Sequence, residues 1–418
     1  MDSSKVAVKL REKVVRFSGE LSKGLPKTAQ RFVGEMIYGI QARQSVMLTD
    51  IARCLEEPTT MKKTEERLSR QLCREGLGRV VQDNLLAEAA GQISDDTLLI
   101  IDPSDIKKKY AKKMQYLAKV WDGSEGQVCD GYWVCNVIGA EADRDKIVPM
   151  YQHLYSAEAP DFVSENDEIL KCVDAIVGHI ERRGIWVMDR GGDRGDLIRP
   201  FLQRRIRFLI RLVGDRHLIF TRKPWLAKDL ATTCPCLYSE TIIKEDKGKE
   251  KVFHIQFGFR KVFLPGCKEQ LYLLVVKGFG QAPLMLLTNI ALRRSRKVLW
   301  KMVKRYFRRW SIEETIRFWK HSYDVENVRV LGYRSLQNMM PIVLAVSYFA
   351  AIVLDTGSKL RITAAYVLKS AKRVFGIPDF RYYAIADGLR NIFMRHPGKP
   401  FRLFWPKSLA RRVQLRLF

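Results

Sequence analysis

The amino-acid sequence predicts an α/β protein whose mixed sheet is interrupted by a β-rich insertion and flanked by helical regions at both ends. Three observations predict this class. Apolar residues recur at spacings of three and four within residues 1–92. Short apolar runs alternate with helical patterns in 93–213 and again in 281–335, which is typical of an α/β core. Helical periodicity is weak in 214–280, whereas residues 336–418 return to a helical pattern.

The N-terminal region is predicted to contain helices over residues 28–40, 49–55 and 61–72. Thr49 and Thr60 are placed to cap the last two of them. The last helix carries four basic residues, which are Lys62, Lys63, Arg67 and Arg70. Two interpretations fit this pattern: a helix-turn-helix that reads DNA, and a helical bundle with a solvated basic face.

The core is expected to begin with an apolar strand at 98–101 that leads directly into Asp102. The run 339–354 is too short to span a bilayer comfortably, and it predicts a buried helix. Between them we expect strands at 132–140 and 146–155, a helix ending near 183, a strand at 185–188, a helix over 193–205, strands at 238–243, 252–259, 270–276 and 284–287, and one long helix over 295–321.

The charge of the chain predicts a polyanionic partner. Among 418 residues there are 73 Lys and Arg against 46 Asp and Glu, a net charge of +27. Nucleic acid and an anionic membrane are the two candidates. No amphipathic anchor helix stands out, so no membrane partner is expected.

The compartment follows from the N-terminus and the cysteines. Residues 1–17 are interrupted by charges and lack the apolar stretch of a signal peptide. Eight cysteines are too few for a disulfide scaffold, and their spacing fits no common zinc site. We therefore expect a soluble, reduced, cytoplasmic protein.

Two aspartates occupy equivalent places in the predicted core. Asp102 and Asp189 each follow a short apolar strand and precede turn-forming residues. The carboxyl ends of such strands are where ligands gather, and two carboxylates placed there repel each other unless a cation lies between them. Taken singly, an Asp after a strand is more often a turn or cap residue.

A polar stripe is predicted on the long helix. Tyr306, Arg309, Glu313 and Lys320 are spaced three, four and seven residues apart, which places them on one helical face. Glu313 could complete a carboxylate site for Mg²⁺, with the cations holding phosphate oxygens. The alternative is a solvated face with an Arg309–Glu313 ion pair, and the spacing leaves both open.

The string Tyr-x-x-Arg-x-x-x-Glu-x-x-x-x-x-x-Lys that begins at Tyr306 resembles the signature of one branch of bacterial insertion-sequence DDE transposases. The block Asp-Arg-Gly-Gly-Asp at 189–193 resembles the surroundings of that family's second acid, and Asp102 matches the first. The resemblance covers about residues 97–340. It is weak over the N-terminal ninety residues and the C-terminal sixty.

The resemblance implies a ribonuclease-H-like core in which Asp102, Asp189 and Glu313 bind two Mg²⁺ ions, with Mn²⁺ as a substitute. It implies cleavage of double-stranded DNA at terminal inverted repeats, followed by joining of the 3′-hydroxyl ends to target DNA. A homodimer is expected because two ends must be joined, in the bacterial cytoplasm at the nucleoid. Residues 1–92 would bind the DNA ends.

Further DNA contacts are expected from the resemblance and from basic runs. Tyr306 and Arg309 would hold DNA near the cleavage site. Trp225, the only tryptophan of the insertion, is a candidate for stacking on a flipped base, with packing as the alternative. The runs 292–309 and 107–113 are expected close to the metal site. The phosphate-binding residues expected there are Lys107, Lys108, Lys109, Arg190, Arg305, Arg308 and Lys320.

Two other functions fit the sequence. One is a metal-dependent nuclease of similar fold that cleaves without joining strands. The other is a non-catalytic DNA-binding protein derived from a transposase, although the intact acidic residues and the intact stripe argue against it. Short inverted repeats and a target duplication around the gene would distinguish a transposase from the nuclease.

Overall fold

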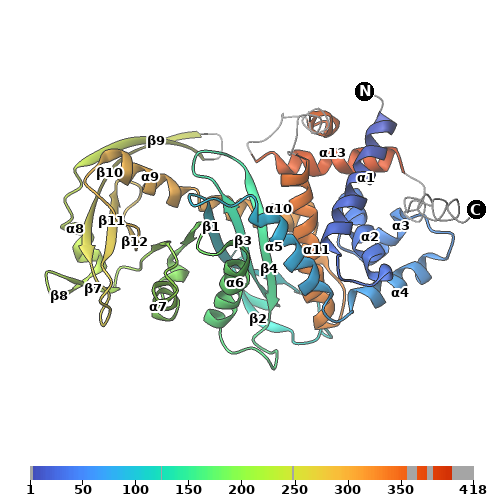
Figure 1. The fold of residues 1–418 in the computed structure, drawn as a ribbon, viewed down its shortest axis with the longest axis horizontal. Helices are drawn as coiled ribbons and strands as arrows, with labels where there is room; N and C mark the ends of the chain where they lie inside the picture. The colour runs from blue at the N-terminus through green and yellow to red at the C-terminus, as the bar shows by residue number, and fades with distance from the viewer. Residues whose placement is uncertain (1–2, 124, 247–248, 355–364, 374–379, 398–418) are drawn as a thin grey trace, which may run out of the picture.

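The computed structural model describes residues 3–123, 125–246, 249–354, 365–373 and 380–397, and it confirms the predicted α/β class with helical regions at both ends (Figure 1). A ten-stranded mixed sheet runs in the order β2-β3-β1-β5-β6-β12-β11-β10-β9, with β4 paired to β3. The strands of its first half are β1 (Leu98–Lys107), β2 (Ala118–Asp122), β3 (Gln127–Ala140), β4 (Ile147–Tyr155), β5 (Ile185–Met188) and β6 (Phe208–Arg211).

Strand β1 lies at the centre of the core and is longer than the sequence predicted. Its first four residues are buried apolar side chains, as expected. The strand continues through Asp102 to Lys107 because the long strand β3 offers it an antiparallel partner as far as Gly131. Asp102 therefore lies within a strand, and the expectation that it ends one was wrong.

The β-rich insertion extends the core sheet. Strands β9 (Tyr238–Asp246), β10 (Lys249–Val262) and β11 (Leu271–Lys277) pair antiparallel with one another. β11 then pairs with β12 (Leu284–Thr288), and β12 pairs with β6. A separate hairpin, β7 (His217–Phe220) with β8 (Lys223–Leu226), lies with the short helix α8 (Ala227–Thr232) at the end of the molecule, far from β1 in Figure 1.

Five helices form the N-terminal region: α1 (Ser3–Leu21), α2 (Lys27–Arg43), α3 (Leu48–Cys54), α4 (Met61–Leu72) and α5 (Leu77–Ala90). The Thr60 cap is confirmed, because its hydroxyl accepts a hydrogen bond from the Lys63 amide at 3.4 Å. The Thr49 cap is wrong: α3 begins at Leu48 with Met47 at its N-cap position, so Thr49 lies inside the helix.

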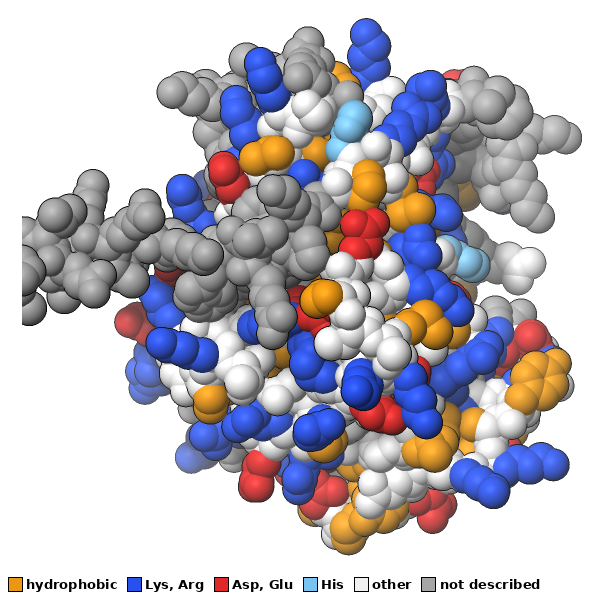
Figure 2. All heavy atoms as spheres, turned by 90° about the vertical axis from the view of Figure 1, so that its right-hand side faces the viewer, with side chains coloured by type: hydrophobic (Ala, Val, Ile, Leu, Met, Phe, Trp, Pro, Cys, Tyr) orange, Lys and Arg blue, Asp and Glu red, His pale blue; other side chains and the backbone are white. Residues whose placement is uncertain are grey.

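A buried charge network fixes α4 against α2. It involves one of the four basic residues of α4, so that residue is not exposed for a contact with DNA. Glu35 is completely buried and pairs with Arg31 at 2.6 Å and with Arg67 at 2.7 Å. Arg67 also pairs with Glu57, so its positive charge is balanced by acids of the helical bundle. Figure 2 shows Lys and Arg side chains spread over this end of the molecule and interspersed with acidic and apolar ones. The basic residues of α4 that remain exposed are Lys62, Lys63 and Arg70.

The predicted buried helix is confirmed as α11 (Tyr333–Tyr348), which continues as one wide turn to Val353. Residues Tyr333–Val353 are long and apolar enough to cross a membrane, but 89% of their 18-residue apolar window is buried inside the fold. α11 packs against α2, α5 and β4. The last described helix, α13 (Tyr382–Arg395), packs against α2. The sequence continues as a basic tail from Lys399 to Arg416, which we expect as part of the helical C-terminal region and which lies outside the described residues.

The predicted long helix is two helices, α9 (Arg296–Phe307) and α10 (Trp310–Ser322), so the single helix over 295–321 was wrong. Aromatic packing accompanies the break. The rings of Phe307 and Trp310 stack with centroids 5.6 Å apart, and both also contact Phe279 from the loop after β11. The two remaining core helices are α6 (Glu165–Ile180) and α7 (Gly195–Gln203).

Candidate active site at the centre of the sheet

The pairing of β1 with β5 brings the two aspartates side by side. The strands are parallel, with Leu98 opposite Ile185 and Ile100 opposite Val187. The same register continued by two residues places Asp102 opposite Asp189. Neighbouring strands lie about 4.8 Å apart, and side chains at one level of a parallel pair point to the same face. The two aspartates, which are far apart in the sequence, are thus neighbours across the β1–β5 pair.

The loop after β5 holds Asp189 in place. Its Oδ1 accepts a hydrogen bond of 2.7 Å from the Gly191 amide, which caps the short helical turn Arg190–Gly192. A Cβ added at Gly192 would lie 2.6 Å from the Cβ of Met188, closer than two carbon atoms can approach. The paired glycines therefore allow the chain to turn tightly beneath the aspartate.

Glu313 reaches the same region from the first turn of α10, which packs against β1 and β3. The Arg309 side chain bridges Glu313 and Asp102 of β1. The Arg309 Nη2 donates to Glu313 Oε1 at 2.6 Å, and its Nη1 lies 3.9 Å from Asp102 Oδ2. Arg309 is only 7% exposed, so this guanidinium is an internal cation between two carboxylates.

Asp102 carries the strongest electrostatic perturbation of the site. Burial raises the pKa of its carboxyl to about 7, and the negative charges of Asp189 and Glu313 also raise it, while Arg309 opposes them. The other two acids are therefore close enough to act on Asp102 through their charge. One guanidinium does not balance three carboxylates, so the site favours an additional cation.

The donor set fits a hard divalent cation, but the carboxylates are not gathered around one point. Among the described residues, no group of three or more His, Cys, Asp or Glu side chains lies close enough to hold a metal ion. Arg309 accounts for this, since it bridges Asp102 and Glu313. Carboxylate oxygens are the ligands that Mg²⁺ prefers. Direct coordination by Glu313 would require Arg309 to release it.

The polar stripe is divided by the break between α9 and α10. Tyr306 belongs to α9 and is 1% exposed, so its ring is part of the core and does not face solvent. Burial raises the pKa of its hydroxyl, against the opposing charges of Arg309 and Arg211. Lys320 lies on α10, and its Nζ is 3.3 Å from Asp105 and 2.9 Å from Glu326.

Three basic residues of the run 292–309 pair with acids outside the candidate site. Arg305 and Lys301 pair with Asp96, just before β1, and Arg305 is 5% exposed. Arg308 pairs with Asp145 at 3.2 Å, in the loop between β3 and β4. These acids lie toward the Leu98 end of β1, so the expectation that this run lies against the metal site was wrong for these residues.

The remaining predicted residues differ in their surroundings. Lys109 and Arg190 are exposed, whereas Lys107 pairs with Asp122 at 2.8 Å. Lys108 is 6% exposed and donates to main-chain carbonyl oxygens, so it is not placed as a phosphate contact. Trp225 is 37% exposed on β8, in the hairpin distant from β1 (Figure 1).

Several supporting residues were not predicted from the sequence. The Asn136 amide, opposite Asp102 on β3, donates to the Asp102 carbonyl at 3.2 Å and to Ser104 at 3.0 Å. Asp193 is buried and accepts from Arg216 and from the Val213 amide, which anchors the loop after β5. These contacts connect positions far apart in the sequence, so they cannot be predicted from a local sequence pattern.

No family model and no curated protein matches this chain. Among solved structures, the chain is similar to a piggyBac transposase in a synaptic complex with hairpin DNA, determined by cryo-electron microscopy. The TM-score is 0.46 and the identity is 10%, over 99% of this chain and 84% of the other. The bacterial insertion-sequence branch indicated by the polar stripe stays a prediction.

Proposed function

We propose that this protein is a DNA transposase of the DDE type, which cleaves DNA at the terminal inverted repeats of an insertion sequence and joins the 3′-hydroxyl ends to target DNA. One observation carries the proposal: the β1–β5 register sets Asp102 beside Asp189, and Arg309 joins Glu313 to the same place. Three acids from separate segments thus share one electrostatic site.

Asp102, Asp189 and Glu313 would hold the divalent cations, Mg²⁺ or Mn²⁺. Bound there, such ions stabilise the charge on the attacking and leaving oxygens of a phosphodiester. The raised pKa of Asp102 supports this assignment, because a carboxyl that holds its proton near neutral pH gains most from a neighbouring cation.

Arg309 and Lys320 have positioning roles in this proposal. Arg309 compensates the acids in the free protein, and once released from Glu313 its planar guanidinium can hold two oxygens of the DNA phosphate. Lys320 is paired with Asp105 and Glu326, so it fixes the segment after α10 against β1.

The proposed reaction also requires a homodimer, because two element ends must be cut and joined together.

The test is a cleavage assay on a labelled duplex that bears the terminal repeat flanking the gene, with Mg²⁺ present. Wild-type protein is expected to release a 3′-hydroxyl end and then a strand-joined product. D102N, D189N and E313Q should each give neither product. D143N is the matched control, because Asp143 is an exposed acid paired with Lys304 away from the carboxylates.

The outcomes separate the alternatives. Cleavage without any joined product identifies the nuclease. Specific binding with no cleavage by wild-type protein identifies the DNA-binding derivative. Normal cleavage by any one of the three variants removes that residue from the site.

A further inference from the structure

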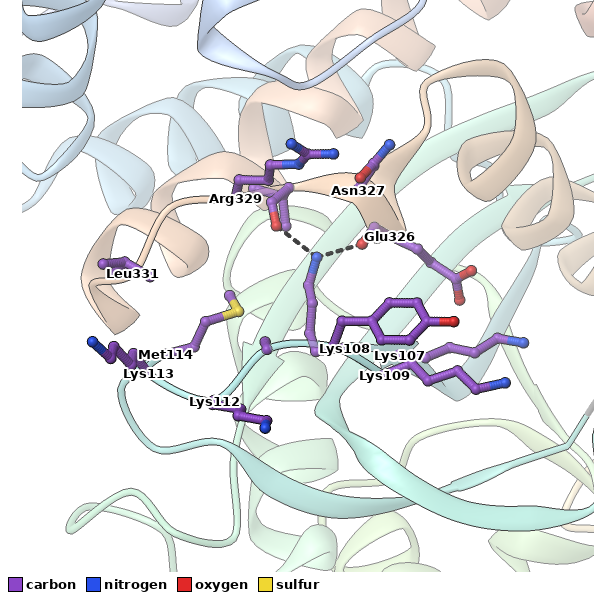
Figure 3. A pocket seen from close by; sticks show the side chains of 13 residues that line it. Lys107, Lys108, Lys109, Lys112, Lys113, Met114, Glu326, Asn327, Arg329 and Leu331 are labelled. Atoms are coloured by element: carbon purple, nitrogen blue, oxygen red, sulfur yellow. Dashed lines mark hydrogen bonds between the residues drawn. The ribbon is translucent and has the colours of Figure 1, made fainter.

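A second site lies at the far end of β1, where a cavity of about 740 Å³ opens between two segments of chain. One wall is formed by residues 107–114, and the other by residues 326–331, between α10 and α11 (Figure 3). The two segments are distant in the sequence and enclose a concave surface at the edge of the core.

The walls of the cavity combine cations with apolar surface. Tyr110 is 88% exposed and Leu331 is 58% exposed, which leaves an aromatic ring and an aliphatic side chain open to solvent in a basic surrounding. Glu326 is the acidic residue of the lining. The exposed cations that line the cavity are Lys109, Lys112, Lys113 and Arg329.

Hydrogen bonds from Lys108 connect the two walls, so the cavity is already formed in the free protein. Its side chain crosses from the end of β1 to the opposite segment, where the ammonium donates to the carbonyl oxygens of Glu326 and Val328, the latter at 2.7 Å (Figure 3). Because Lys108 is 6% exposed, this link is shielded from water.

The cavity is joined to the candidate active site. Glu326 accepts from Lys108 through its carbonyl and pairs with Lys320 through its carboxylate at 2.9 Å. Lys320 also contacts Asp105, which lies three residues beyond Asp102 on β1. The lining of the cavity begins at Lys107, about 17 Å from Asp102 along the strand. A few nucleotides of an extended single strand cover that distance.

The chemistry of a single nucleotide complements the aromatic and basic side chains of this lining. Its base offers a flat π surface that stacks on an aromatic side chain, and its phosphates are held by lysine and arginine. A duplex hides its base faces, whereas an unpaired strand exposes them. We propose that this cavity binds one unpaired nucleotide of the DNA strand, a few nucleotides from the cleavage site, with Tyr110 stacked on the base. Only its role near the cleavage site rests on the proposed function.

The test measures binding by the full-length protein in EDTA, so that no cleavage occurs. The probes are a fluorescent duplex with a short single-stranded 3′ overhang and the same duplex with blunt ends. Y110A is expected to weaken overhang binding about tenfold, because a stacked base loses its platform. Y110F should stay within about twofold of wild type, since the ring is kept.

W121A serves as the matched control, because Trp121 is an exposed aromatic on β2 that does not line the cavity. It should bind both probes as wild type does, and all variants should bind the blunt duplex equally. Equal losses by Y110A on both probes, or no loss on either, would overturn the proposal. Such a result leaves the cleavage assay untouched, so the two proposals fail separately.

A fluorescent adenine analogue in the overhang reports the stacking directly. Wild type and Y110F should quench the unpaired 2-aminopurine on binding, and Y110A should quench it less at saturating protein. Identical quenching by all three proteins would show that the base lies elsewhere.

Discussion

Asp102 holds a carboxylate in surroundings that disfavour its charge. Burial and two neighbouring acids raise its pKa to about 7, and Arg309 offsets only part of this. A group whose pKa is higher in the folded than in the unfolded state stabilises the fold only while it stays protonated. Metal-free stability should therefore fall as pH rises from about 4 to about 7.

Replacing the Asp102 carboxylate should change stability and activity in opposite directions. In metal-free buffer at pH 8, D102N should unfold at a higher temperature than wild type, by about 2 °C or more, because it removes the repulsion. End cleavage should fall by at least about a hundredfold, since a metal ligand is lost. Thermal unfolding at pH 5 and pH 8 checks the first point. A lower melting temperature for D102N at pH 8 would contradict this description of the site.

Arg309 acts as the internal cation of the site, and its removal should expose that role. R309A is expected to lower metal-free stability by about 1–2 kcal/mol, because Asp102 and Glu313 lose their partner. Mg²⁺ should then stabilise the variant more than it stabilises wild type, since no guanidinium competes.

R308A is the neighbouring control, as Arg308 pairs with Asp145 outside the site. It should show the wild-type response to Mg²⁺. If R309A and R308A respond alike in thermal unfolding with and without Mg²⁺, Arg309 does not occupy the metal position.

At the scale of the elements, the loop after β5 determines where Asp189 lies. G192A should destabilise the protein by about 1–3 kcal/mol, because its Cβ would meet Met188 at 2.6 Å and the loop must shift. G195A, at the start of α7, meets nothing within 4 Å and should be neutral or slightly stabilising. Denaturant unfolding and end cleavage of both variants provide the check. Equal behaviour of the two would contradict the tight turn.

The positions of the strands and helices were predictable only in part from the sequence. The apolar runs before Asp102 and Asp189 located two strands, because period and composition are local properties. The end of β1 could not be found in this way, since its extension past Asp102 depends on pairing with β3. The break at Arg308–Arg309 was missed for a related reason: it is accompanied by packing against Phe279, which lies far away in the sequence.

The sequence motif indicated three acids for the candidate site, and their role as metal ligands stays a prediction. Asp102, Asp189 and Glu313 were located by motif, and the structure brings their charges within reach of one another. Basic runs carry no information about their partners, so the pairing of Arg305 with Asp96 and the burial of Lys108 could not be foreseen. Burial of Tyr306 likewise follows from the tertiary fold.

For the whole molecule, the net charge of +27 should dominate DNA affinity. Binding to any duplex is expected to weaken by about a hundredfold or more between 50 and 200 mM salt, as counterions return to the phosphates. D102N should show the same salt slope, because an acid of the metal site is not a phosphate contact. Fluorescence anisotropy over a salt series measures both, and a slope near zero would rule out an electrostatic interface.

In the proposed function, three acids from β1, the loop after β5 and α10 share divalent cations. Calorimetric titration of the metal-free protein with Mn²⁺ tests this sharing at pH 6.5, where a carboxyl with a pKa of about 7 is still mostly protonated. Binding should occur with release of protons, since Asp102 must lose its proton, and it should be abolished in D102N, D189N and E313Q but retained in D143N. Undiminished Mn²⁺ binding by all three variants would show that these acids do not hold the metal ions.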